Sequence, residues 1–380
     1  MTAALPEELL EEIFLRLPPD EPEWLLCASL ASKLWLGLLS GPSFRGRYRD
    51  LHGAPPMLGF LYSLYLRSGE KDEQHAPNLV PTTKFRPRVP DGGWRSWRYT
   101  PLDCRHGRVL LAAEDVIPEP LIIWDPMTGC QRELDTPFKT DRNHRATVLC
   151  AASGCDHRDC HDGRFQVVFV GLCGTEDSSY ARACVFSSET GEWGKQCSSL
   201  YLDDETLIEP IPPVLIEDAL FFMCAHDRTA KLGIIKYDLG SNRLSLIDSL
   251  VGHAPLGAAI LMAKEDGCLG FARVDGLTLY LWSRQIMDSD KVASWTVKPR
   301  VVNLKNLLPT QSPMENVYLG GSVQGSDIIF VTTDLGVYEV NLKSVQCKKN
   351  WRREEYFNSL IPYVSFYHPQ GRVSTCDVAH

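Results

Sequence analysis

Residues 120–134 read PLIIWDPMTGCQREL, an apolar run followed by a short turn and a more polar run. The apolar run is rich in branched and aromatic side chains, which is typical of a β-strand. The turn PMTG combines Pro and Gly, two residues that commonly reverse the direction of a chain. This stretch therefore predicts two strands joined by a tight turn.

The same kind of unit is visible five times. In each, an apolar strand and a turn precede a strand that ends in an aromatic or polar residue, and a short turn leads to one more strand. The units contain RVLLAAED with PLIIWDPMTGCQREL, FQVVFVGLC with ARACVFSSETGEWGKQ, DALFFMCAHD with LGIIKYDLGSNRLSLI, CLGFARVD with LTLYLWSR and ASWTV, and DIIFVTTD with GVYEVNLKSVQCKK. Their marker residues, Asp125, Ser187, Asp238, Trp282 and Asn341, recur at roughly 45–60 residues, the spacing of four-stranded propeller blades with variable loops.

Two segments far apart in the chain supply one more sheet. PPMLGFLYS (55–63) and LIPYVSFYHP (360–369) both have strand character. Pairing the first strand with the last closes a ring and removes its open edges, which a propeller needs. We therefore expect about six blades, with five or seven as alternatives.

The first 45 residues differ, because their apolar side chains recur at helical spacing. Leu9, Leu10, Ile13, Phe14 and Leu17 define one face of a helix that Pro18 and Pro19 end. Two further apolar blocks, at 24–30 and 34–39, predict a second and a third helix before Gly41-Pro42. Three helices of this size are too few to enclose a core of their own, so we expect a partner to cover them.

Composition limits the classes of partner. The 380 residues include 44% hydrophobic and 23% charged residues, with a formal net charge of −9. This acidity argues against a nucleic-acid or anionic-membrane surface. No apolar run reaches the length of a membrane span, and an acidic N-terminus is unlike a signal peptide. The 13 scattered cysteines indicate free thiols in a reducing compartment, so we expect the cytoplasm or the nucleus.

The opening block resembles an F-box. Leu-Pro at 5–6 begins the pattern, a basic-x-Trp stands at 33–35 and a turn-Pro-x-Phe at 40–44. The remainder resembles the F-box-associated C-terminal region of plant F-box proteins, particularly the large grass group. That resemblance rests on APPMLGFLYS, IIWDPMTG, AASGCDHRDCHDGRFQVVFVG, VFSSETGEW and SLIPYVSFYHP.

The resemblance implies a fold class and a division into domains. We expect a mainly β protein with a small all-α N-terminal domain, a three-helix F-box followed by a β-propeller. The F-box domain is expected at 1–48, a linker with the closing strand at 49–100, and the propeller-like recognition domain at 101–380.

The resemblance also implies a function. F-box helices bind a Skp-type adaptor that joins a cullin–RING ubiquitin ligase, while the C-terminal domain captures a target protein. The residues expected at the adaptor are Leu5, Pro6, Leu9, Leu10, Ile13, Phe14, Leu17, Pro18, Leu26, Trp35, Leu38 and Phe44. The chain would perform no chemistry and need no cofactor. A non-degradative F-box scaffold and a propeller-fold enzyme are the alternatives.

One segment suggests a metal site. CAASGCDHRDCHDG (150–163) contains Cys155, His157, Cys160 and His161, which are zinc-ligand types. All lie in one expected loop without a second ligand pair, so a polar hairpin loop with local turn hydrogen bonds is the favoured alternative. We expect no metal.

Other motifs have structural interpretations that we favour. GGSVQG (320–325) departs from the nucleophile-elbow pattern GxSxG at Gln324 and indicates a hairpin turn. Arg45, Arg47 and Arg49 are expected on the solvated surface, with contact to an acidic adaptor as the alternative. Five blade aromatics are expected between blades, namely Trp124, Trp193, Tyr237, Trp282 and Tyr338. Long connections, at 136–146, 174–180, 198–211, 284–294 and 306–316, are candidates for target recognition.

Overall fold

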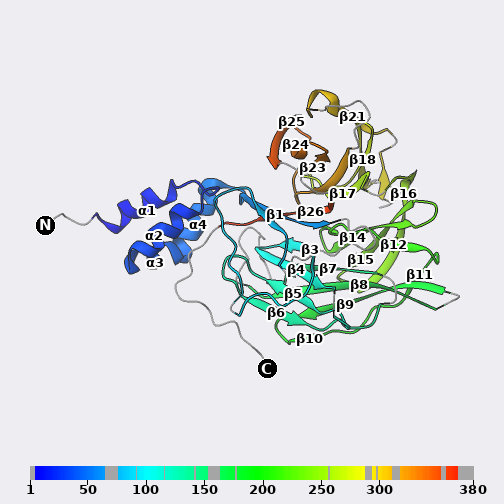
Figure 1. Cartoon of the computed structure of the whole chain (residues 1–380), viewed down its shortest axis with the longest axis horizontal. Coiled ribbons are helices and arrows are strands. Elements are labelled where there is room, and N and C mark those ends of the chain that lie inside the picture. Colours follow the sequence, from blue (N-terminus) through cyan, green and yellow to red (C-terminus); the bar gives the residue numbers. More distant parts are fainter. Residues whose placement is uncertain are drawn as a thin grey trace.

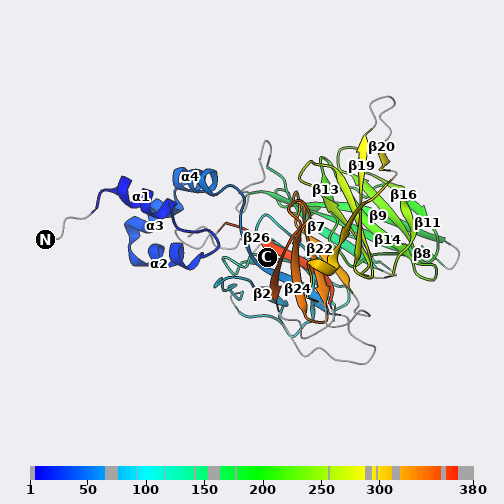
Figure 2. The same cartoon turned by 90° about the horizontal axis from the view of Figure 1, so that it is seen from above.

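The computed structural model contains a small group of helices beside a ring of β-sheets (Figures 1 and 2). The description covers residues 5–64, 76–90, 92–114, 116–140, 143–152, 163–175, 178–255, 257–286, 293–296, 298–309, 317–351 and 357–366. In both views the helices lie at one end of the molecule and the sheets at the other.

Four helices form the N-terminal part. They are α1 (Glu7–Leu15), α2 (Glu23–Ala31), α3 (Lys33–Ser40) and α4 (Pro42–His52). The sequence indicates three helices and a terminating turn at Gly41-Pro42. Instead, Pro42 is the first residue of α4. Its fixed φ suits a first helical turn, where the missing N–H has no partner to lose.

Six sheets follow, one for each blade. The first contains β2 (Leu79–Pro81), β1 (Met57–Leu64) and β26 (Phe357–Val364); the second contains β3 (Tyr99–Arg105), β4 (Arg108–Ala113), β5 (Leu121–Trp124) and β6 (Gln131–Leu134). The third contains β7 (His144–Cys150), β8 (Phe165–Thr175), β9 (Ser178–Ser187), β10 (Glu192–Trp193) and β11 (Leu200–Leu202). All neighbouring strands pair antiparallel.

The other three sheets follow the same plan. The fourth contains β12 (Thr206–Ile208), β13 (Val214–Ile216), β14 (Ala219–His226), β15 (Lys231–Asp238) and β16 (Arg243–His253). The fifth contains β17 (Ala259–Ala263), β18 (Leu269–Asp275), β19 (Thr278–Ile286), β20 (Ala293–Trp295) and β21 (Arg300–Asn303), which leads into η1 (Leu304–Asn306). The sixth contains β22 (Tyr318–Ser322), β23 (Ile328–Thr333), β24 (Gly336–Asn341) and β25 (Gln346–Trp351). The five repeated units and the count of six blades are thereby confirmed.

The ring closes through its first and last strands, as the sequence predicts. β1 pairs with β26 in a register that runs from Met57 opposite Val364 to Leu64 opposite Phe357. The innermost strands then contact one another around a central channel in the order β26, β3, β7, β12 with β13, β17 and β22. Among the described residues, the β1–β26 ladder is the pairing that joins the start of the propeller to its end, and it closes the ring.

Most of the marker residues share a structural role. Asp125, Asp238 and Asn341 each end the third strand of a blade and accept hydrogen bonds from backbone N–H groups two or three residues further on. Such Asx turns fix the direction of the following strand. Trp282 is the exception, because it lies in the middle of β19 and not at the end of a strand.

Gly320 and Gly321 of GGSVQG allow two blades to meet. A Cβ on Gly321 would lie 2.3 Å from the backbone oxygen of Leu360 in β26. These residues belong to β22 and its turn, with a bulge between Leu319 and Gly321. The motif is therefore a hairpin segment, and glycine is required by the close approach of two inner strands.

The interior of the ring consists of apolar layers between neighbouring blades. Trp124, Tyr237 and Tyr338 are buried in them, and Trp193 and Trp282 pack against them, so these aromatics support the blades. Among the described residues, nine cysteines carry free thiols. Cys130 is disulfide-bonded, which differs from the free thiols expected from the sequence.

One side chain joins the helices to the ring. Phe366, just after β26, is buried in the core of the helical part, with its ring centroid 6.0 Å from that of Tyr48. Lys84, between β2 and β3, forms an ion pair of 3.1 Å with Glu23 of α2. The helices are thus held against the ring at two places besides the short connection 53–56.

The Phe366→Ala variant is expected to lose about 3–5 kcal/mol of stability in the helical part, because a large buried ring is removed. Hydrogen exchange of the α1–α4 amides measures this. Leu30→Ala, at a residue that is 77% exposed, is the control and should change stability by under about 0.5 kcal/mol. Equal protection of the helices in wild type and Phe366→Ala would show that Phe366 does not complete this core.

Candidate functional site

The helical part has its own small core. Leu10, Phe14, Leu25, Leu39 and Phe44 are buried in it. Further buried members are Leu15, Ala28, Tyr48 and Phe366. The Tyr48 hydroxyl donates to the carbonyl of Leu17 (2.8 Å), and burial raises its pKa. The core is completed by Phe366, which follows the last propeller strand in the sequence. The sequence alone does not reveal this contact.

A row of apolar side chains on α1 and just before it faces away from this core. Leu9 and Ile13 lie four residues apart on α1 and are 51% and 47% exposed, and residues at this spacing lie above one another on one helix face. Leu5, which is 53% exposed, precedes the helix and its N-cap residue Pro6. We call this row the α1 face. The blades do not cover it, because the helices project from the ring (Figure 1).

The residues expected at the adaptor fall into groups by burial. Leu5, Pro6, Leu9 and Ile13 are exposed. Five are partly exposed: Leu17, Pro18, Leu26, Trp35 and Leu38. Leu10, Phe14 and Phe44 belong to the core, where they support the α1 face from below.

Four exposed large apolar side chains of the helices were not among those expected at a partner. Trp24 is 50%, Leu30 77%, Leu34 50% and Leu51 60% exposed. Leu34 is the variable residue of the basic-x-Trp motif, so the motif predicts Trp35 and not Leu34 at the adaptor. Trp35 packs its ring edge-on against Phe14, at 5.2 Å between centroids. Helical spacing alone does not distinguish inward from outward residues in helices this short and this apolar.

An ion-pair cluster fixes α4 against α1. Arg47 pairs with Glu11 at 2.9 Å and also with Glu12. Hydrogen bonds to the two carboxylates raise the pKa of Arg47. Arg47 lies on the solvated surface, as expected from the sequence, and pairs there with α1. So exposed an ion pair stabilises only weakly.

The ring has two ends, which we name by their turns. The proximal rim carries the turns 106–107, 217–218 and 323–327, and the distal rim the turns 227–230, 276–277 and 334–335. β1 begins at the proximal rim, because Met57 lies opposite the end of β26. The helical part, which ends at His52, is consequently attached at the proximal rim.

A pocket of about 790 Å³ opens at the proximal mouth of the channel. It is lined by the 106–107 and 323–325 turns, the start of β13, and the connection Gly53–Pro55 together with Phe366. Most of the lining is apolar, and burial raises the pKa of the Cys104 thiol. The volume is in the range of small-molecule sites.

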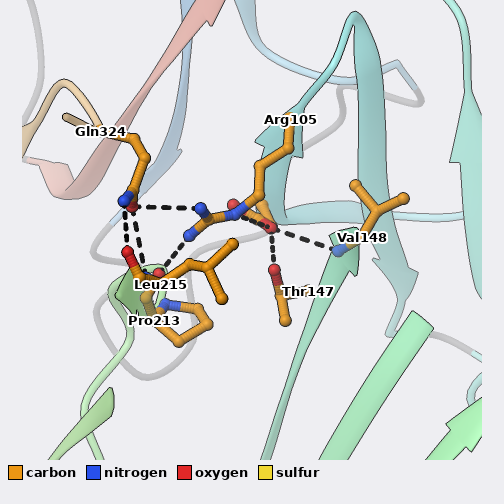
Figure 3. Close-up of polar contacts among 7 residues, drawn as sticks. Arg105, Thr147, Val148, Pro213, Leu215 and Gln324 are labelled. Carbon is orange, nitrogen blue, oxygen red and sulfur yellow. Dashed lines mark hydrogen bonds and ion pairs between the residues drawn. The ribbon is translucent and has the colours of Figure 1, made fainter. Parts of the chain in front are cut away.

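A polar network spans this mouth (Figure 3). Arg105 of β3 donates from Nε to Asp103 (3.0 Å), from one terminal nitrogen to Gln324 Oε1 (3.1 Å), and from the other to the carbonyl of Pro213. Gln324 also donates to the carbonyl of Leu215 at 2.6 Å. Three non-adjacent blades, the second, fourth and sixth, are connected in this way.

Asp103 anchors the network to the third blade. Its carboxylate accepts from the Thr147 hydroxyl and from the backbone N–H of Val148 (3.2 Å). The Asp103–Arg105 pair is buried, so each charge depends on the other for its solvation. We call these residues the channel network. It holds the blades in register at the channel mouth.

The candidate recognition loops divide between the rims. Four connections have their described residues at the distal rim, namely 136–146, 174–180, 198–211 and 306–316. Three of them lead into the start of a blade's innermost strand, and 174–180 joins the second strand of a blade to the third. The 284–294 connection begins at the proximal rim, where Arg284 lies opposite Leu269. The zinc-ligand candidates Cys155, His157, Cys160 and His161 lie outside the described residues.

In the described part of the chain, no group of three or more His, Cys, Asp or Glu side chains is arranged to hold a metal ion. Within the same residues no helix has the length and apolarity needed to cross a bilayer.

Comparison with known proteins identifies the helical part. Residues 3–45 match the F-box domain family. The F-box protein At5g03970 of Arabidopsis thaliana is 22% identical over 377 residues, covering 93% of this chain and 85% of that protein. Among solved structures, TolB from Acinetobacter baumannii is 12% identical with a TM-score of 0.43, covering 87% of this chain and 73% of that chain. The gluconolactonase PpgL of Pseudomonas aeruginosa is 12% identical with a TM-score of 0.43, covering 78% and 82%.

Replacing Arg105 with Ala is expected to destabilise the ring by about 3–5 kcal/mol, because the buried Asp103 loses its counter-charge. Urea unfolding of the propeller measures the effect. Arg95→Ala, which removes an exposed pair with Glu133, is the control and should cost at most about 1 kcal/mol. If both variants unfold at the same urea concentration, the channel network does not hold the blades together.

Proposed function

We propose that this chain, which joins an F-box domain to a six-bladed β-propeller, is a substrate-recruiting subunit of a Skp–cullin–F-box ubiquitin ligase. The helices bind a Skp-type adaptor, and the adaptor connects them to a cullin. The propeller binds the target protein. The chain itself positions the target protein and catalyses no step. It acts in the cytoplasm or the nucleus.

The observation that carries this proposal is the exposed α1 face. Leu5, Leu9 and Ile13 lie within the segment that matches the F-box family, yet about half of each side chain is in water. Covering large aliphatic side chains provides roughly 25 cal/mol per Å² of apolar surface. A partner that covers the α1 face gains this free energy, whereas the blades do not.

The attachment of the helices supports the same function. Phe366 and the Lys84–Glu23 pair hold the F-box domain against the proximal rim. A target on the propeller is then kept at a defined distance from whatever binds the helices. Holding two reactants in one assembly raises their effective concentration, which is how a non-catalytic subunit accelerates transfer to a lysine.

Two other functions make different predictions. A non-degradative F-box scaffold would bind the adaptor equally but would support no ubiquitination of a bound target. A propeller-fold enzyme would use the proximal pocket, where Asp103 and Arg105 are already committed to the channel network. A ubiquitination assay on a bound target separates the first alternative, and turnover by the chain alone would reveal the second.

The Leu9→Asp/Ile13→Asp double variant is expected to weaken adaptor binding by at least 100-fold, because two charges would be placed in an apolar interface. Co-purification and titration with a Skp-type adaptor measure this. Both residues are exposed, so the variant should still fold.

The matched control is Leu246→Asp/Val301→Asp. These residues are also aliphatic and about half exposed (49% and 56%), but they lie on propeller strands β16 and β21. The control should bind the adaptor as the wild type does. Unchanged adaptor binding by Leu9→Asp/Ile13→Asp, or no binding by the wild-type chain, would refute the proposal.

A further inference from the structure

A groove of about 510 Å³ lies on the distal rim, between the third and fourth blades. Its walls come from Ser179 of β9, the end of β11 with the turn after it (Tyr201–Glu205), and His226 of β14. We call it the distal groove. In Figures 1 and 2, β11 lies at the end of the molecule away from the helices.

The groove is where two of the candidate recognition connections meet. β11 pairs with β9 so that Leu202 lies opposite Ser179 and Tyr201 opposite Tyr180. This pairing brings the 198–211 connection against the 174–180 connection. Strands occupy much of both segments, namely β8 and β9 in 174–180 and β11 and β12 in 198–211, so neither is the long loop that the sequence suggests. The case for a binding surface here therefore rests on the hollow and on the side chains that line it.

The charge of the groove is one-sided. Asp203, Asp204 and Glu205 are consecutive, and the lining contains no Lys or Arg. Glu205 holds the mostly exposed Arg228 at 2.6 Å from the adjacent β14–β15 turn. The fold thus already places one cationic side chain beside these carboxylates, and the side chains of Asp203 and Asp204 are exposed.

A buried hydroxyl in the same lining lacks a hydrogen-bond partner. Ser179 is 1% exposed, and no described group bonds to its Oγ. Leaving a buried polar atom unpaired costs about 1–3 kcal/mol. Because Ser179 lies on the groove side of β9, like Ala181 and Ala183 of the core between these blades, a donor entering the groove would satisfy it.

We propose that the distal groove receives a lysine side chain of the recruited protein, an inference that rests on the proposed function. The ammonium group has three donors and no acceptor, which suits carboxylates and an unpaired hydroxyl. It is also compact, whereas the planar guanidinium of arginine requires a fork of coplanar acceptors.

The test uses the full-length chain and a fluorescein-labelled peptide of Gly, Ser and three spaced lysines, with an acetyl-lysine peptide as the uncharged reference. Asp203→Asn/Asp204→Asn should weaken binding of the lysine peptide at least tenfold. The matched control, Glu192→Gln/Asp218→Asn, removes the same charge from exposed positions toward the proximal rim and should change binding less than twofold.

Ser179→Ala separates a binding role from a structural one. If the hydroxyl awaits a ligand, the variant binds the lysine peptide at least threefold more weakly while its melting temperature stays equal or rises. A Ser179→Ala variant that melts earlier and binds normally would contradict the proposed role.

Other outcomes overturn the proposal outright. They are equal effects of the two charge-removing variants, no binding of the lysine peptide at low salt, and equal binding of the acetyl-lysine peptide or of a matched peptide with arginine in place of each lysine. Titration of the same preparations with the Skp-type adaptor distinguishes failure of this inference from failure of the proposed function. A chain that binds the adaptor but not the lysine peptide keeps the proposed function and loses this inference; the reverse result refutes the proposed function.

Discussion

The pairing of β1 with β26 is the interaction on which the rest of this structure depends. It joins segments about three hundred residues apart, between Met57–Leu64 and Phe357–Val364. Without it, β1 of the first blade would have an unpaired edge, β22 of the sixth blade would lose its neighbour β26, and the channel network would have no closed ring to span. The ladder also sets where the helices stand, because α4 leads into β1 and Phe366 follows β26 directly.

Much of the fold can be predicted from the sequence because its signals are local and repeated. Each blade carries its own apolar strand and its own turn chemistry, so Asp125, Asp238 and Asn341 reveal their role through their neighbours. The closing pair could be predicted from the need to remove edges. The fourth helix was missed because Pro42 is compatible with both a stop and a start, and only packing decides between them.

The functional surfaces depend on relations that the sequence does not state. The F-box pattern identifies the helices, but it does not show which leucines face outward. Leu9 and Leu10 are adjacent in the sequence, yet Leu9 is exposed and Leu10 is buried. Gln324 was noticed only as a departure from a motif, although it bonds across the channel to Arg105 and Leu215. Contacts between blades two positions apart in the ring leave no periodic trace in the chain.

The placement of Phe366 has a consequence for biosynthesis. The core of the helices, which are made first, includes a ring from a residue made after the last strand of the propeller. While the ribosome is still adding blades, that core lacks a member, and the short α1 and α4 have less apolar surface to pack against. The order of synthesis therefore ties maturation of the N-terminal domain to completion of the ring, so that an unfinished chain presents a less ordered docking domain than a finished one.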